Sequence, residues 1–149
     1  MIDPKHIGYR TTPTVLVVDS WRVKLFCKAI GENDPVYWDI DTAQSAGLPA
    51  CPVPPTYLKA IEGDHCTSAD LLQVLGIPVK GVLHAEQSFT YFSQVYVDDV
   101  VEVSREIVDI YEKKSGAYNF VVVDSHFKVK DKLAASNRQV ILIRNKATA

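Results

Sequence analysis

The stretch YNFVVVDSHFKV, from Tyr118 to Val129, decides the class of fold that we expect. β-Branched and aromatic residues dominate it, and its end alternates polar and apolar residues with the period of two that is typical of a strand. Such a segment, about 12 residues long, exceeds the usual strand length and predicts a strongly curved sheet. Three more stretches have the same composition: Val82–Val95, Val100–Tyr111 and Gln139–Arg144. Short polar turns separate these stretches, so the series predicts an antiparallel meander.

The first half of the chain carries helix signals and many residues that break helices. Asp19-Ser20 can cap a helix that Gly31 ends, and proline is well tolerated at the first position of a helix. The predicted elements are a strand at Val15–Val18 and helices over about residues 20–30, from Asp41-Thr42 to Gly47, from Pro54-Pro55 onward and from Ser68 to Leu75. A curved sheet needs apolar segments inside its concave face. The sequence therefore predicts an α+β fold with one antiparallel sheet wrapped around a helix.

Length and composition restrict the chain to one globular domain, residues 1–149. Hydrophobic residues make up 47% and charged residues 23%, which excludes a disordered chain or a disulfide scaffold. No apolar run is long enough for a membrane span and the net charge of −2 is scattered, so we expect neither a membrane nor a nucleic-acid partner. The polar N-terminus is unlike a signal peptide, and the three cysteines match no zinc pattern. We therefore expect a cytoplasmic protein without a metal.

Three segments resemble parts of the MaoC-like dehydratases. Phe26–Asp39, FCKAIGENDPVYWD, resembles the hydratase segment of that family. Val53–Leu58, VPPTYL, is similar to its entry to the central helix, and Leu83–Phe89, LHAEQSF, to the start of the next strand. Their shared order implies a single hotdog fold over roughly residues 10–145. The resemblance also implies reversible hydration of a 2-enoyl thioester, or dehydration of a 3-hydroxyacyl thioester, carried on coenzyme A or acyl carrier protein without another cofactor.

The residues that this family uses for chemistry are altered in this sequence. By the resemblance, the catalytic Asp falls on Glu32, the catalytic His on Tyr37 and a neighbouring Asn on Asp34. The extra methylene of Glu displaces the carboxylate, and a phenol with a pKa near 10 is a poor base at neutral pH. The pair Pro54-Pro55 also lacks two backbone donors where the family forms an oxyanion hole. The resemblance therefore implies the degenerate, N-terminal type of hotdog, which binds the acyl chain beside a catalytic hotdog.

The candidate site residues fall into two groups. The candidates for catalysis are Glu32 and Tyr37, and those for substrate binding are Asp34, Trp38, Pro55, Thr56 and His84. Several also have a structural interpretation, because Asp34 before a proline suits a turn and Trp38 suits a core. His84 either donates a hydrogen bond to the thioester or has a structural role at the start of its strand.

Four functions remain open on the sequence. The first is the acyl-binding subunit of an (R)-specific enoyl-thioester hydratase or 3-hydroxyacyl-thioester dehydratase. The second is a self-sufficient hydratase that uses Glu32 with Tyr37 or His84. The third is a non-enzymatic acyl-thioester binding protein, and the fourth, favoured least, is a thioesterase with Glu62 as its base. Because an unpaired long edge strand promotes aggregation, we expect a homodimer, or a heterodimer with a catalytic hotdog chain.

Overall fold

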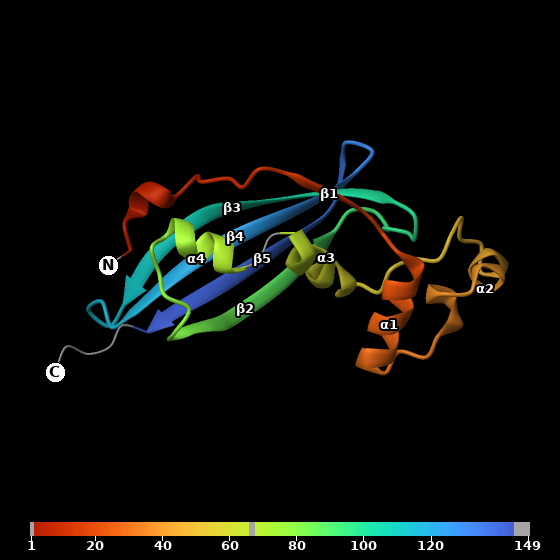
Figure 1. Ribbon diagram of the computed structural model, residues 1–149, viewed down its shortest axis with the longest axis horizontal. Coiled ribbons are helices and arrows are strands. Elements are labelled where there is room, and N and C mark those ends of the chain that lie inside the picture. Colours follow the sequence, from red (N-terminus) through yellow and green to blue (C-terminus); the bar gives the residue numbers. More distant parts are fainter. Residues whose placement is uncertain (1, 66–67, 145–149) are drawn as a thin grey trace.

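The computed structural model describes residues 2–65 and 68–144, which form one five-stranded sheet with helices on one side (Figure 1). The strands are β1 (Thr14–Val17), β2 (Val82–Tyr91), β3 (Val100–Lys113), β4 (Tyr118–Val129) and β5 (Lys132–Arg144). The α-helices are α1 (Ser20–Ile30), α2 (Ile40–Ser45), α3 (Tyr57–His65) and α4 (Ser68–Val74), and the 3₁₀ helices are η1 (Pro4–His6) and η2 (Pro35–Tyr37). The predicted α+β class is confirmed.

The strand order is β1-β3-β4-β5-β2, and every pairing is antiparallel. β3, β4 and β5 form the predicted meander, but β2 pairs with β5 instead of with β3, which follows it in the sequence. The prediction of one meander through all four strands is wrong here, because β1 already occupies the outer edge of β3 with Thr14 opposite Val103. β2 therefore pairs at the free edge of β5 and becomes an edge strand itself.

Two strand boundaries also differ from the prediction. β5 begins at Lys132 instead of Gln139, because its first half is small and polar and is held as a strand by pairing with β4. β2 ends at Tyr91 instead of Val95, since the chain turns there and the next two backbone N–H groups both donate to the Ala134 carbonyl. Both differences come from contacts with neighbouring strands, which local sequence does not contain.

α1 forms where the sequence predicts it, and both of its caps are present. Asp19 Oδ1 accepts a hydrogen bond from the Arg22 N–H at 2.9 Å, which satisfies one free donor of the first turn. Gly31 ends the helix with a φ of 76°, in the left-handed region. Glu32 follows directly, so this cap sets the direction in which the candidate loop leaves the helix.

We expect Gly31→Ala to lower the free energy of unfolding by about 1–2 kcal/mol. A Cβ at Gly31 would meet no atom within 4 Å, so the cost comes from the left-handed backbone alone. Urea denaturation followed by circular dichroism measures the loss. Gly63→Ala in α3 is the matched control, because its added Cβ also meets nothing within 4 Å while its φ is not positive. That variant should be neutral or more stable by up to about 1 kcal/mol, and an equal loss at both positions would contradict the explanation.

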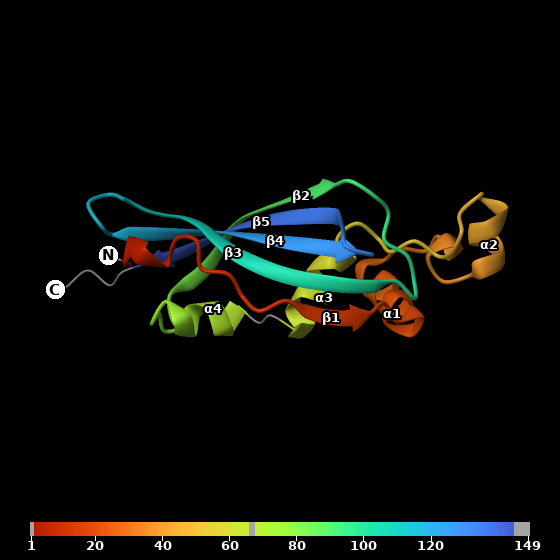
Figure 2. The ribbon, with the colours of Figure 1, turned by 90° about the horizontal axis from the view of Figure 1, so that it is seen from above.

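α3 and α4 cover one face of the curved sheet, while α1 and α2 lie toward one end of it (Figures 1 and 2). Buried apolar residues gather in two groups on this face. The α3 cluster contains Val18, Val23, Cys27, Val53, Tyr57, Leu58, Ile61, Val95, Val101, Val103, Phe127, Ala134 and Ala135. The α4 cluster contains Leu71, Leu75, Ile107, Val121, Val123, Ile141 and Ile143. Within residues 2–65 and 68–144, no helix is long and apolar enough to cross a membrane.

Candidate functional site

Glu32 and Asp34 lie in the loop after α1, and both carboxylates bind the backbone of that loop. Glu32 Oε1 accepts a hydrogen bond from the Asp34 N–H at 2.9 Å. Asp34 Oδ1 accepts one from the Val36 N–H at 3.0 Å and so caps η2. Asp34 therefore shapes the turn, as a residue before proline often does, and one carboxylate oxygen of Glu32 is occupied by the same turn.

Tyr37 and Trp38 follow in the same loop and pack, partly buried, against the α3 cluster. Burial, followed by the negative charges of Glu32 and Asp34, raises the pKa of Tyr37 above its ordinary value. The phenol is therefore protonated at neutral pH, so it can donate a hydrogen bond but cannot take a proton from water. The loop brings the two candidate catalytic residues together without forming a base and acid pair like Asp and His.

A cavity of about 420 Å³ lies beside the start of α3, within the usual size range of small-molecule sites. Its walls come from the segment before α3, from α3 and from the end of β2 with the linker that follows. The lining residues are Val53, Pro55, Leu58, Tyr91, Phe92, Ser93, Gln94 and Val95. Pro55 is one of the predicted substrate-binding residues, and Thr56 beside it is exposed. Walls with this many apolar side chains suit an alkyl chain.

The start of α3 offers few backbone donors for an oxyanion. Pro54 and Pro55 have no N–H group. The Tyr57 N–H donates to the Pro54 carbonyl at 2.9 Å. Three donors that a helix start could present are therefore absent or used, which weakens the stabilisation of a thioester oxyanion at this position.

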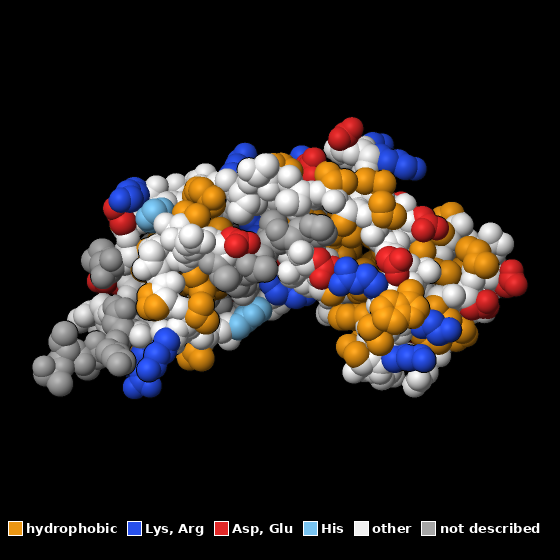
Figure 3. All heavy atoms as spheres, viewed as in Figure 1, with side chains coloured by type: hydrophobic (Ala, Val, Ile, Leu, Met, Phe, Trp, Pro, Cys, Tyr) orange, Lys and Arg blue, Asp and Glu red, His pale blue; other side chains and the backbone are white. Residues whose placement is uncertain are grey.

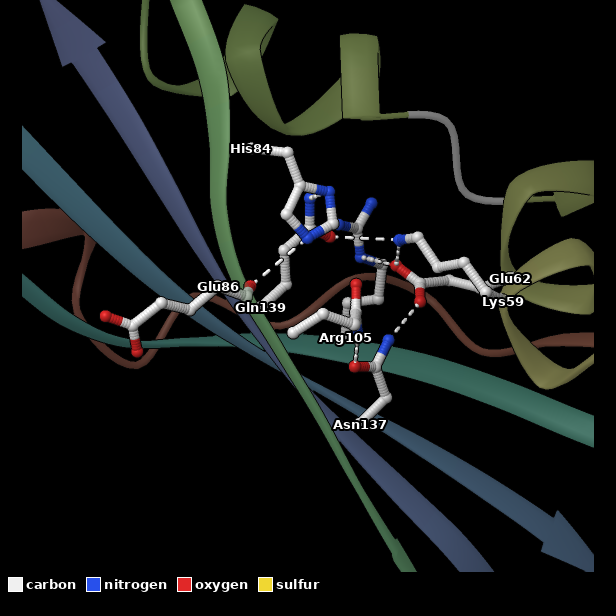
Figure 4. Close-up of polar contacts among 8 residues, drawn as sticks. Lys59, Glu62, His84, Glu86, Arg105, Asn137 and Gln139 are labelled. Atoms are coloured by element: carbon white, nitrogen blue, oxygen red, sulfur yellow. Dashed lines mark hydrogen bonds and ion pairs between the residues drawn. The ribbon is translucent and has the colours of Figure 1, made fainter. Parts of the chain in front are cut away.

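A buried polar cluster lies under α3, and sequence reasoning missed it (Figure 4). This Glu62 cluster consists of Lys59, Glu62, His84, Gln87, Arg105, Asn137 and Gln139. Arg105 Nε lies 3.1 Å from Glu62 Oε1, and the two side chains are 0% and 1% exposed. Asn137 Nδ2 donates to Glu62 Oε2 at 2.7 Å, and Lys59 Nζ lies 3.1 Å from Glu62 Oε1. The carboxylate thus holds two cations and one amide.

These contacts bear on the thioesterase alternative. A carboxylate that activates water needs an oxygen within reach of that water. Both oxygens of Glu62 are bound inside the protein, and the side chain is 1% exposed. Glu62 therefore acts as the counter-ion of Arg105 and not as an accessible base.

The accessible side of the Glu62 cluster ends at His84. Lys59 Nζ donates to Gln139 Oε1 at 3.0 Å, so the Gln139 amide nitrogen faces His84 Nδ1, at 3.4 Å. Nδ1 then accepts and Nε2 carries the ring proton, which it donates to the Glu86 carbonyl at 3.1 Å. The register of β2 on β5 shifts between His84 and Glu86, and the imidazole lies beside Gln139 (Figure 4). His84 belongs to this cluster and is absent from the described residues that line the cavity.

Two of the cysteines are buried free thiols. Burial is the main reason that the pKa values of Cys27 and Cys51 lie above the ordinary value for a thiol. A thiol with a raised pKa is a poor nucleophile at neutral pH. Among the residues that the structure describes, no three His, Cys, Asp or Glu side chains are grouped to hold a metal ion. Cys66 lies outside the described residues.

The amino-acid sequence is similar to one protein family and to several known proteins. The family described as "FAS1-like, dehydratase domain region" matches residues 5–136. A UPF0336 protein from Streptomyces avermitilis is 30% identical over 122 residues, which is 81% of this chain and 79% of the relative. A UPF0336 protein from Parafrankia sp. is 31% identical over 117 residues, with 78% and 75% covered.

Solved structures are similar over nearly the whole chain. The HadBC (3R-hydroxyacyl-ACP dehydratase) complex from Mycobacterium tuberculosis superposes with a TM-score of 0.78 at 16% identity, covering 92% of this chain and 96% of that one. The ChsH1-ChsH2 complex from the same organism gives 0.75 at 21% identity, covering 94% and 91%. The (R)-hydratase from A. caviae gives 0.68 at 19% identity, covering 91% and 94%. At these identities the likeness shows the fold, which is the predicted hotdog.

Proposed function

The chain belongs to the FAS1-like dehydratase region family, and from this membership we propose that it is the acyl-binding subunit of an (R)-specific enoyl-thioester hydratase or 3-hydroxyacyl-thioester dehydratase. The observation that carries the proposal is the loop after α1. There Glu32 lies at the position of the family's Asp, and one of its carboxylate oxygens is bound to its own turn. Tyr37 lies at the position of the family's His, and its phenol is protonated because its pKa is raised. The substrate would be an acyl thioester of coenzyme A or of acyl carrier protein, without a further cofactor.

The chemistry explains why a second chain is needed. Adding water across a double bond requires a base for the water and an acid for the carbon that becomes protonated. Glu32 could act as a base through its second oxygen, but Tyr37 is a weak partner because its pKa is raised. The cavity beside α3, with its apolar walls, supports a binding role. In this proposal the chain holds the acyl group and a catalytic hotdog supplies the reacting side chains.

In this proposal the second chain binds at the sheet edge that β2 forms. This strand lies at the edge of the sheet, and an edge of ten residues is open to pairing with another strand. Leu83 on β2 is 55% exposed, and Phe92, the first residue after the end of β2, is 59% exposed. Two of the similar structures are of complexes, which supports a heterodimer, with a homodimer as the alternative. The free thiols of Cys27 and Cys51 support a reducing compartment, the cytoplasm.

The test compares the purified chain alone with the chain bound to a catalytic partner captured from its native host. Crotonyl-CoA and longer enoyl thioesters are followed by loss of the enoyl absorbance. We expect no turnover by the chain alone and enzymatic rates, on the order of 1–1000 per second, for the complex. Glu32→Gln in the complex keeps the shape of the side chain, removes its base, and should leave the rate within about twofold.

Two results would contradict the proposal. Enzymatic turnover by the folded chain alone, abolished by Glu32→Gln, would establish a self-sufficient hydratase. Binding of acyl thioesters without any catalytic partner in the native host would favour a simple binding protein. Circular dichroism of each variant ensures that a lost rate reflects chemistry and not unfolding.

A further inference from the structure

A row of polar side chains crosses the helix-covered face of the sheet. Arg105 on β3 lies opposite Ser125 on β4, and Ser125 lies opposite Asn137 on β5. All three are buried, at 1%, 0% and 0% exposure. Glu62 of α3 closes the row from above through its contacts with Arg105 and Asn137. We call these four residues the polar row.

The polar row separates the two apolar clusters. On one side of it, Val103, Phe127 and Ala135 belong to the α3 cluster. On the other side, Ile107 and Val123 belong to the α4 cluster. Opposite Val123 on β5 lies Gln139, which is also buried and polar, and the apolar residues of that cluster resume on β5 at Ile141. An ordinary core would continue through this position with apolar residues. The buried ion pair therefore interrupts an apolar surface that runs along three strands.

The cavity opens on one side of this interruption only. Of its lining residues, Val53, Leu58 and Val95 are members of the α3 cluster, and none of the described lining residues belongs to the α4 cluster. From Leu58 to Glu62 is one turn of α3, a rise of about 6 Å. Leu58 and Ile61 lie between the cavity and Glu62 on α3 and are buried, so an alkyl chain that extends along α3 has to displace them before it meets the polar row.

From this arrangement we propose that the polar row sets the upper length of the acyl chain that this subunit accepts, an inference that rests on the proposed acyl-binding function. Methylenes that extend among the α3 cluster exchange contacts with water for contacts with apolar side chains. A methylene that reaches the polar row has to separate Glu62 from Arg105 or Asn137. Uncompensated buried charge costs far more than one methylene gains, so longer tails gain nothing.

The wild-type protein provides the first test. Affinities for even-numbered saturated acyl-CoAs, from butanoyl to hexadecanoyl, are measured by isothermal titration calorimetry. Within the α3 cluster each methylene should tighten binding about threefold to fourfold. At the chain length that meets the polar row the gain should stop, and longer chains should bind no tighter. A steady gain through hexadecanoyl-CoA would overturn the proposal without any variant.

The second test replaces the row by apolar residues of similar volume. The triple variant Glu62→Leu, Arg105→Met, Asn137→Leu removes the ion pair and its amide together, an exchange that buried ion pairs tolerate better than the loss of one partner. Its affinities should go on rising for at least two chain lengths beyond the wild-type break. A folded triple variant with the wild-type break would overturn the proposal.

The control is an ion pair between β4 and β5 on the opposite face of the sheet. Arg138 on β5 binds Asp124 on β4 with two contacts of 2.7 Å. The double variant Asp124→Asn, Arg138→Gln should keep the wild-type break, and a shifted break would overturn the assignment to the polar row. If no acyl-CoA binds at any length, the proposed function fails and the inference fails with it. Binding without a break contradicts the inference alone.

Discussion

Glu62→Leu should lower the free energy of unfolding by about 3–5 kcal/mol. The substitution removes the carboxylate that lies 3.1 Å from Arg105 Nε, and the Arg105 side chain, which is 0% exposed, then loses the ion pair with Glu62 inside the core. Lys59 is 34% exposed and can turn its ammonium to solvent, so the loss comes mainly from Arg105. For a chain of this size the melting temperature should fall on the order of 10 °C.

Urea denaturation of a double-mutant cycle measures this prediction. Arg105→Met in the Glu62→Leu background should recover most of the lost stability, because no charge of the pair then remains buried. Asp124→Asn, which breaks the exposed pair with Arg138, is the matched control and should cost no more than about 1 kcal/mol. A double variant as unstable as Glu62→Leu alone would show that packing, and not charge, explains the loss.

Phe92→Asp should weaken association of the chain with its partner about 100-fold. Phe92 is a 59% exposed aromatic residue directly after edge strand β2, and it also lines the cavity. Exposed aromatic residues at such positions often carry about 2–4 kcal/mol of interface energy. An aspartate at position 92 would also place a negative charge in the proposed interface at β2, where it would lose water on association. Analytical ultracentrifugation over a range of concentrations gives the association constants.

Trp21→Asp is the control for this experiment. Trp21 is 68% exposed on α1, a helix that is not part of the sheet edge formed by β2. Hydrophobic side chains lie beside Lys or Arg side chains on the surface over α1 (Figures 1 and 3). Like Phe92→Asp, Trp21→Asp replaces an exposed aromatic residue by an aspartate. The association constant of this variant should stay within about twofold of the wild-type value. Equal weakening by both variants, or by neither, would contradict an interface at β2.

The elements that the sequence predicted well are those held by local signals. The cap at Asp19 and the left-handed Gly31 delimit α1 through contacts within a few residues. β3 and β4 are recognisable from β-branched residues alone. The resemblance to MaoC-like dehydratases, carried by three short segments, is confirmed by the family match and by the fold. In each case the information lies within one element or one segment.

The elements that the sequence predicted poorly depend on distant partners. The first half of β5 is small and polar, and its Asn137 points into the Glu62 cluster, so this half lacks the pattern of a strand. The pairing of β2 with β5 depends on β1, which takes the competing edge of β3. Neither fact can be read from one stretch of chain, and both follow from which edges are already occupied.

The candidate site divides in the same way. The loop roles of Glu32 and Asp34 follow from turn chemistry that the sequence already indicates. The sequence does contain a signal for Arg105, because it lies two residues from both Val103 and Ile107 in a predicted strand. Every second residue of a strand points to the same face, so Arg105 shares the inward face of these two apolar residues. Which carboxylate meets it depends on how α3 lies on the sheet. The sequence alone indicates Glu62 only as a candidate base, because its partner Arg105 lies on another element of the fold.

The strand order has a consequence for synthesis of the chain. β2 leaves the ribosome well before β5, and until β5 is made it has no strand to pair with. A long unpaired strand in a nascent chain is the kind of segment that associates with other chains. Glu86 and Ser88, which are exposed on β2, reduce that hazard by making one side of the strand polar. The last strand to emerge therefore completes the sheet and ends the period in which this protein is most prone to aggregate.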